Sequence, residues 1–316
     1  MTTETVHPLD PETLKLFAAK GTQGGPGILQ VGNANSVKVR RVMQITSDLT
    51  KMPFEQLRIL DLACGEGVYA IEAALRGAKV LAVDARTERM DEGARTARRL
   101  GLSNLEFEQN DIRKVNNQSY GQFDVIFFLG ILYHLDAQDV FPVLRNIYEM
   151  CGQFVVIDTH ISLAETDEVE HDRHVYKGTK VREHADADPE VVRKSRLLSS
   201  LDNTWSFFFT TESLIRLLND TGFSSVYFCN VPLEPMKPRD RITLVAIKGT
   251  PVRISSYPWV NDKTESEIEV FLRTSEKPAR EQTDPARSHL KQRAKSTING
   301  MLRPFGFEIT RIDWER

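Results

Sequence analysis

The chain has 316 residues, 41% hydrophobic and 27% charged, which is enough to bury a large core and excludes a disordered or collagen-like protein. Its 41 basic and 44 acidic residues give a formal net charge of −3, so the whole chain lacks the positive charge typical of non-specific nucleic-acid binding. Three cysteines, Cys64, Cys151 and Cys229, are too few and too far apart for a disulfide framework or a thiolate zinc site.

Membrane and export signals are not expected. The longest apolar run, 125–133, is far shorter than a membrane-spanning helix and is interrupted by Gly130. Near the N-terminus, Glu4, Asp10 and Glu12 stand where an export signal would carry basic residues. With the sparse cysteines, these features predict a cytoplasmic protein.

The first fifty residues predict a helix at 11–20, a glycine-rich link, and a second helix that runs towards Asp48. Two interpretations of the glycine-rich segment 21–32 remain open: a flap over an active site, or a plain linker. We therefore treat residues 1–52 as an N-terminal helical segment with a glycine-rich flap.

From residue 58 onward, short β-rich apolar runs alternate with helical segments, the pattern of a parallel sheet covered on both faces. Five successive strands are predicted, at 58–63, 79–84, 105–109, 124–129 and 153–158. Between 161 and 204 the alternation stops in a polar, acidic stretch with three of the seven histidines, which predicts an insertion or lid.

After the insertion the sequence predicts a helix at 210–220 and two more strands, at 224–231 and 241–248. The proline-rich link between these strands is too short for a crossover helix, so the pair should be antiparallel. Residues 250–316 read as a C-terminal extension of loop and basic helices. Two interpretations of its basic residues remain open: a contact with RNA phosphates or an anionic surface, or a solvated helix face or oligomer contact. These residues include Lys291, Arg293, Lys295 and Arg303.

A glycine-bearing turn follows the first strand, in the sequence Asp61-Leu-Ala-Cys-Gly-Glu-Gly67. Glycines at such a turn let the backbone approach a ligand at a helix N-terminus. Asp84 ends the next strand 23 residues later, where nucleotide sites of α/β proteins place a carboxylate on ribose hydroxyls. Asp111 and Ile112 end the third strand and suit the amine and the face of an adenine ring. The third glycine of a dinucleotide site and a P-loop are both missing, so the expected ligand is adenosine-like without phosphates.

This series of motifs resembles the class I S-adenosylmethionine-dependent methyltransferases, over about 58–249. The resemblance implies a seven-stranded, doubly wound, Rossmann-like sheet in the order 3-2-1-4-5-7-6, with strand 7 antiparallel, and a methyltransferase domain at 53–249. It also implies S-adenosylmethionine as cofactor, with Asp84 on the ribose and the first turn on the methionyl part. The predicted cofactor residues are Asp61, Ala63, Cys64, Gly65, Gly67, Asp84, Ala85, Asp111, Ile112, Leu129 and Gly130.

The fourth strand ends in Leu129-Gly-Ile-Leu-Tyr-His134, which is similar to a segment of the tRNA wobble-uridine carboxymethyltransferases and their relatives. That resemblance implies that Tyr133 lies near the transferred group. Lys20 and Arg241 are candidates for holding the extra carboxylate of a carboxylated cofactor. The Asn/Asp-Pro-Pro-Tyr/Phe segment of amide and adenine N-methyltransferases is absent, which argues against those acceptors.

His134 is the first candidate for a catalytic base, because histidine ordinarily has a pKa of about 6.5. The alternative is that His134 caps the following helix or braces its loop. His160, at the end of the fifth strand, is a second candidate base or substrate contact. Methyl transfer itself needs mainly in-line positioning and removal of the acceptor's proton.

Two further groups follow in the chain. His160, His171, His174 and His184 could in principle bind a divalent ion, but an acidic lid with scattered histidines is the simpler interpretation, and no metal site is predicted. The Asn-x-Trp-x-Phe arrangement of the same relatives implies that Asn203 and Trp205 face the pocket. The competing interpretation is a buried strand that contains Trp205.

The sequence thus predicts a methyltransferase that acts on a small molecule, with oxygen as the preferred acceptor atom. A homodimer is the assembly considered for this chain. Two alternatives remain: a tRNA-modifying methyl or carboxymethyl transferase, and a non-catalytic protein of the same fold that binds cofactor or a partner.

Overall fold

The computed structural model describes residues 34–234 and 237–250. The chain divides into two units, 1–251 and 252–316, and all described residues belong to the first. The expected helix at 11–20, the glycine-rich flap, Lys20 and the basic C-terminal helices lie outside the described residues.

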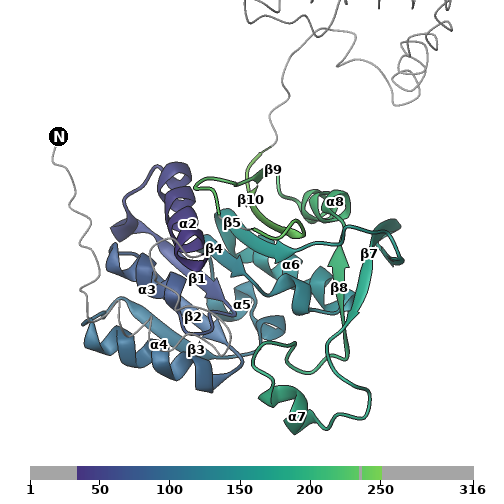
Figure 1. The fold of residues 1–316 in the computed structure, drawn as a ribbon. Coiled ribbons are helices and arrows are strands. Elements are labelled where there is room, and N and C mark those ends of the chain that lie inside the picture. The colour runs from purple at the N-terminus through teal and green to yellow at the C-terminus, as the bar shows by residue number, and fades with distance from the viewer. Residues whose placement is uncertain (1–33, 235–236, 251–316) are drawn as a thin grey trace, which may run out of the picture. The chain divides into compact units, whose positions relative to one another are not determined.

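A seven-stranded sheet forms the centre of the described unit (Figure 1). Its strands are β1 (Arg58–Leu62), β2 (Lys79–Asp84), β3 (Leu105–Gln109), β4 (Phe123–Leu129), β5 (Cys151–His160), β9 (Ser225–Phe228) and β10 (Arg241–Ile247). They are ordered β3-β2-β1-β4-β5-β10-β9, and β10 runs antiparallel to both of its neighbours. The predicted order 3-2-1-4-5-7-6 with an antiparallel seventh strand is confirmed.

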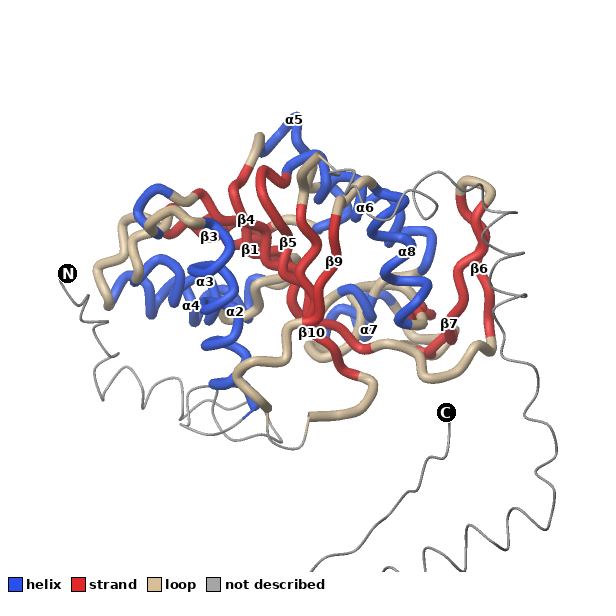
Figure 2. Tube along the Cα trace, turned by 90° about the horizontal axis from the view of Figure 1, so that it is seen from above, coloured by secondary structure: helices blue, strands red, loops and turns tan. Residues whose placement is uncertain are grey.

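Helices cover both faces of this sheet, as the two views agree (Figures 1 and 2). One face packs against α2 (Ala34–Thr50), α3 (Val68–Leu75) and α4 (Thr87–Arg99), and the other against α6 (Ala137–Met150) and α8 (Thr211–Thr221). Alternate residues of β1 enter the two cores: Ile59 belongs to the first, Leu60 and Leu62 to the second. Burial on both faces explains why these strands are almost continuously apolar in sequence.

Short elements occupy the connections: η1 (Phe54–Gln56), η2 (Ile112–Lys114), α5 (Asn117–Tyr120) and η3 (Leu132–His134). Because β1 to β4 are parallel neighbours, the loops after their carboxyl ends gather at one edge of the sheet. Among the described residues, no helix is long and apolar enough to cross a membrane.

The predicted insertion or lid at 161–204 contains regular structure. β6 (Asp167–His171) and β7 (His174–Arg182) form an antiparallel hairpin, and β8 (Trp205–Phe209) adds a third strand. α7 (Glu190–Ser195) and the connecting loops lie outside that sheet (Figure 1). The hairpin escaped prediction because most of its side chains are polar and only partly buried.

The second sheet is anchored to the main core through aromatic side chains. Tyr176, Phe207 and Phe209 are each at most 1% exposed and belong to the same hydrophobic cluster as α6 and α8. Gly178 permits the close pairing of β7 with β8, because a Cβ there would lie 2.2 Å from the carbonyl oxygen of Phe208. The insertion therefore sits on the sheet at a fixed place, beside the carboxyl ends of the strands.

Candidate active site

A cavity of about 450 Å³ lies at the carboxyl ends of β1 to β4. This volume falls within the usual range for a small-molecule site. Its walls come from the loops after these strands, from Val39 of α2, and from the stretch 197–203 of the insertion. We call residues 197–203 the lid segment.

Most of the predicted cofactor residues line this cavity. They are Ala63, Cys64, Gly65, Asp84, Ala85, Asp111, Ile112, Leu129 and Gly130. Asp61 and Gly67 are not among the residues that line it. Gly67 has φ of +69° at the start of α3, and a Cβ there would lie 2.6 Å from the ring of Phe107, so this position requires glycine.

Asp84 braces the first turn. Its Oδ2 accepts a hydrogen bond from the Gly65 N–H at 2.9 Å and its Oδ1 accepts one from the Arg86 N–H at 2.9 Å. The side chain is buried. Each carboxylate oxygen retains a second lone pair for a ligand hydroxyl.

Asp61 is almost completely buried, and its Oδ2 has no hydrogen-bond partner among the described residues. Burial, and to a smaller extent the charge of Asp84, raise its pKa to about 8, against an opposing hydrogen bond from the backbone of Ala70. Nearby, burial and the charges of Asp61 and Asp84 raise the pKa of the Cys64 thiol, so this cysteine lines the cavity as a neutral group.

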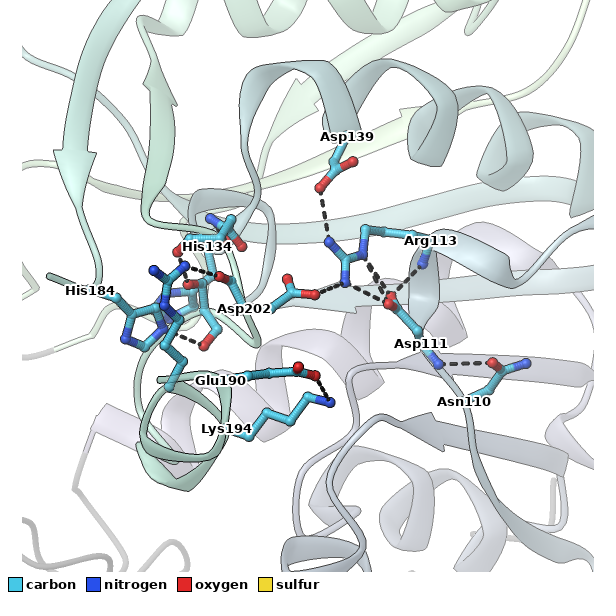
Figure 3. Close-up of polar contacts among 12 residues, drawn as sticks. Asn110, Asp111, Arg113, His134, Asp139, His184, Glu190, Lys194 and Asp202 are labelled. Carbon is cyan, nitrogen blue, oxygen red and sulfur yellow. Dashed lines mark hydrogen bonds and ion pairs between the residues drawn. The ribbon is translucent and has the colours of Figure 1, made fainter. Parts of the chain in front are cut away.

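Asp111 is engaged with Arg113, which contacts it through Nε and Nη2 at 2.9 and 2.7 Å (Figure 3). Burial by itself would raise the pKa of Asp111, but the hydrogen bonds and charge of Arg113 lower it below its ordinary value. The same guanidinium reaches Asp139 of α6 at 3.2 Å and Asp202 of the lid segment at 2.8 Å. Arg113 thus joins the end of β3 to the insertion.

The lid segment is held down by arginines that sequence analysis did not single out. Nη2 of Arg86 donates to the carbonyl oxygens of Ser199 and Ser200, both at 3.0 Å. Nη1 of Arg89 donates to the Leu197 carbonyl at 3.3 Å, while its other nitrogens pair with Glu66. Since arginines after β2 bind backbone carbonyls far along the chain, no sequence motif marks this contact.

Tyr133 and His134 line the cavity beyond the end of β4, as predicted. Nδ1 of His134 lies 2.8 Å from Oε1 of Glu183, a residue of the insertion directly after β7. No partner for Nε2 of His134 is found in the described part of the chain. Asn203 also lines the cavity, and its Nδ2 donates to the His134 carbonyl at 3.1 Å.

His160 occupies a different environment from the one expected of a base. It does not line the cavity, and both ring nitrogens are engaged: Nδ1 with Asp240 at 2.9 Å and Nε2 with Arg241 at 3.0 Å. Arg241 is itself paired with Asp158, through Nε at 2.7 Å. The prediction of a catalytic role for His160 is therefore not supported, because its basic nitrogen is already occupied.

Trp205 corrects a second expectation, since it does not face the cavity. Its side chain is 40% exposed and lies beneath the guanidinium of Arg182, its register partner on β7. The inward positions of β8 go to Phe207 and Phe209. The interpretation of this stretch as a strand is confirmed.

The histidines of the insertion are dispersed. His171 stacks on Phe141, and His174 pairs with Asp220. His184 is buried, and its Nε2 lies within hydrogen-bonding distance of the Ser200 carbonyl oxygen, at 3.0 Å. No group of three or more potential metal ligands occurs in the part of the chain that the structure describes. The four histidines do not form the cluster that a metal site would require.

Comparison with known proteins supports the methyltransferase interpretation. Residues 59–153 match the family model described as a methyltransferase domain. The ubiquinone biosynthesis O-methyltransferase of Acinetobacter baumannii (strain AYE) is 30% identical over 104 residues, or 33% of this chain and 41% of the relative. The protein of the same name from Methylocella silvestris is 32% identical over 83 residues, or 26% of this chain and 32% of the relative. The chain thus matches about two fifths or less of these relatives.

The fold is shared with the N-terminal domain of EvdMO1, crystallised in the presence of SAH and D-fucose. That structure has 19% sequence identity and a TM-score of 0.53, and the match covers 72% of this chain and 89% of that one. Residues 59–153 thus match a methyltransferase domain, and they lie within a sheet of the order 3-2-1-4-5-7-6 expected for that fold.

Proposed function

We propose that the protein is an S-adenosylmethionine-dependent methyltransferase that transfers a methyl group to an oxygen atom of a small molecule. The observation that carries this proposal is a single cavity that follows the ends of β3, β2, β1 and β4 in spatial order and holds the imidazole of His134 at the β4 end. The relatives named as O-methyltransferases support oxygen as the acceptor atom.

The residues along the cavity fit the parts of this cofactor in the same order. Asp111 and Ile112 at the β3 end suit an adenine, and Asp84 at the β2 end suits ribose hydroxyls. Strands lie about 4.8 Å apart, so four neighbouring ends offer a row of contacts roughly 14 Å long. At the β1 end, Ala63, Cys64 and Gly65 of the first turn line the cavity and suit the methionyl part.

When bound, S-adenosylmethionine supplies a methyl group activated by a positively charged sulfonium. The protein must then hold the acceptor in line and remove its proton. His134 is the residue placed for proton removal, because Nε2 has no partner among the described residues and the side chain lines the cavity. Tyr133 forms the wall beside it.

The way the lid segment encloses this cavity favours a small acceptor molecule. The lid segment covers the site and is tied to the loops after β2 and β3 by Arg86, Arg89 and Arg113. A cavity of about 450 Å³ shared with a nucleoside leaves room for a compact molecule. The resemblance to tRNA-modifying enzymes, the cytoplasmic location and the homodimer remain predictions.

Calorimetric titration of the full chain tests cofactor binding, with S-adenosylhomocysteine, carboxy-S-adenosylmethionine and NAD in parallel. We expect binding of S-adenosylhomocysteine in preference to the other two. Preference for the carboxylated compound would redirect the search to tRNA, and preference for NAD or no binding at all would refute the proposal.

A matched pair of aspartates sharpens this test. Asp84→Asn removes the charge at the predicted ribose contact and should weaken S-adenosylhomocysteine binding about 10- to 100-fold, the effect of losing a charged hydrogen bond. Asp124→Asn is the control, because Asp124 binds Arg58 and Gln153 at the opposite edge of the sheet. Equal binding by both variants would contradict the assignment of Asp84.

The catalytic part is tested with a panel of small hydroxyl-bearing acceptors, by release of S-adenosylhomocysteine. His134→Asn should leave cofactor affinity within about twofold and lower kcat by roughly 10²- to 10⁴-fold, the usual contribution of a general base. Unchanged turnover in this variant would remove His134 from the mechanism.

A further inference from the structure

We propose that Glu183, carried by the insertion, is a positioning residue that fixes the tautomer and orientation of His134 so that its Nε2 is the proton acceptor. This inference rests on the proposed function and deepens it. The insertion would then take part in catalysis by setting the state of the base, beyond enclosing the site.

The geometry of the pair is that of an oriented imidazole. The His134 Nδ1 and Glu183 Oε1 atoms are 2.8 Å apart, and the two side chains are only 17% and 9% exposed. A carboxylate can only accept, so His134 carries its proton on Nδ1 when it is neutral. The free lone pair is then on Nε2.

Glu183 stays ionised in this position. Burial by itself would raise its pKa, but the hydrogen bond and charge of His134 and the N–H of Ser200 lower it below its ordinary value. An ionised carboxylate beside Nδ1 also stabilises the imidazolium that forms when His134 takes up a proton.

The second oxygen of Glu183 ties it to the lid segment. Oε2 accepts a hydrogen bond from the Ser200 N–H at 3.1 Å. The Ser200 carbonyl in turn accepts from Arg86, two residues after Asp84. A continuous series of contacts thus connects the predicted ribose site to the base through the lid segment.

The proton balance of the step is complete with these groups. The acceptor oxygen forms a bond to the methyl carbon, and the carbon–sulfur bond breaks with its electron pair on sulfur. The acceptor's O–H proton passes to Nε2 of His134, which becomes an imidazolium paired with Glu183. Solvent removes that proton afterwards.

Nitrogen NMR of histidine measures the tautomer directly and does not require the acceptor to be known. The full chain, labelled with ¹⁵N-histidine, has seven histidines, and His134→Asn identifies the signal of His134. At a pH where this ring is neutral, we expect the Nδ1-protonated form in the wild type. Glu183→Ala should shift the ring towards the Nε2-protonated form that free imidazoles favour.

Asp240→Ala is the matched control, because the Asp240 carboxylate contacts Nδ1 of His160 at 2.9 Å, just as Glu183 contacts Nδ1 of His134. This change should alter the signal of His160 and leave that of His134 unchanged. An unchanged His134 tautomer in Glu183→Ala would overturn the inference, as would an Nε2-protonated ring in the wild type.

A conservative variant covers the case in which Glu183→Ala fails to fold. Glu183→Gln keeps an oxygen acceptor for the Nδ1 proton but removes the charge, so the tautomer should persist while kcat falls at least tenfold with KM little changed. Equal kcat in wild type and Glu183→Gln would refute the positioning role.

Titration with S-adenosylhomocysteine separates this inference from the proposed function. Loss of the tautomer effect in a chain that still binds S-adenosylhomocysteine would refute only the role of Glu183. A chain that does not bind S-adenosylhomocysteine would refute the proposed function, whatever the state of the His134 ring.

Discussion

Asp61→Asn should change how the stability of the protein depends on pH. The buried carboxyl has a pKa of about 8, against an ordinary value of 3.8. In the unfolded chain this group ionises near pH 4, whereas in the folded chain it keeps its proton up to about pH 8. The unfolded state therefore binds fewer protons between these values, and the free energy of unfolding falls as pH rises through this window.

The magnitude follows from the size of the shift. Each pH unit well inside the window lowers the free energy of unfolding by about 1.4 kcal/mol, and the slope decreases near pH 8, where the group is half ionised. The contribution of Asp61 therefore falls by about 2 kcal/mol between pH 6 and pH 8. Above about pH 8 both states are ionised, and this contribution becomes constant. Asp61→Asn has nearly the same shape and no proton to lose, so its stability should lack this fall.

Urea denaturation of both proteins at pH 6, 7, 8 and 9 measures the difference, because all other titrating groups are common to the two chains. We expect the variant to gain on the wild type steadily up to about pH 8. Parallel curves for the two unliganded proteins over the whole range would refute the buried, raised-pKa state of Asp61.

Two further changes test the insertion. Gly178→Ala should lower the free energy of unfolding, measured by urea denaturation, by about 2–3 kcal/mol, because the new Cβ would overlap the Phe208 carbonyl. Gly101→Ala is the control: Gly101 has φ of +68° and open space around it, so this change should cost only about 1 kcal/mol. Arg86→Ala removes donors to the Ser199 and Ser200 carbonyls. Trypsin should therefore cut directly before the lid segment, after Lys194 and Arg196, several-fold faster than in the wild type or in the control Arg99→Ala. Equal cleavage rates in all three would show that these contacts do not hold the segment in place.

The sheet could be predicted from the sequence because its strands are buried on both faces. Each therefore appears as a short, nearly uniform apolar run, and the turn residues stand at its carboxyl end. The bounds predicted for β2 and β3 agree with the structure at both ends. The proline-rich link before β10 left no room for a crossover, which is why the antiparallel final strand was also predictable.

The strands of the insertion could not be predicted in the same way, because most of their side chains are polar and only partly buried. In β6, acidic residues flank the single Val169, and such a pattern does not differ from that of a solvated loop. The burial that makes it a sheet comes from aromatic residues that lie far along the chain, on β8 and α6.

In the candidate site, too, residues at strand ends could be predicted from the sequence, whereas contacts between residues far apart in the chain could not. Asp84, Asp111 and Gly65 are local to strand ends, so their positions in the cavity could be inferred from spacing. The partner of His134 could not be predicted, because Glu183 lies 49 residues further along the chain, directly after a hairpin with no sequence signal. His160 was predicted as a candidate base for the same reason: its ring nitrogens contact Asp240 and Arg241, about 80 residues further along the chain, and the sequence does not indicate these contacts.

This division indicates where specificity resides. The loops after β1, β2 and β3 face the part of the cavity that suits a nucleoside, and their residues are set by requirements that any acceptor would share. The insertion supplies the lid segment, Asn203 and Glu183, which surround the predicted base. A change in the insertion can therefore alter the acceptor site and the state of His134 together while leaving the contacts of Asp84 and Gly65 intact, so the acceptor should be sought through variants of residues 183–203.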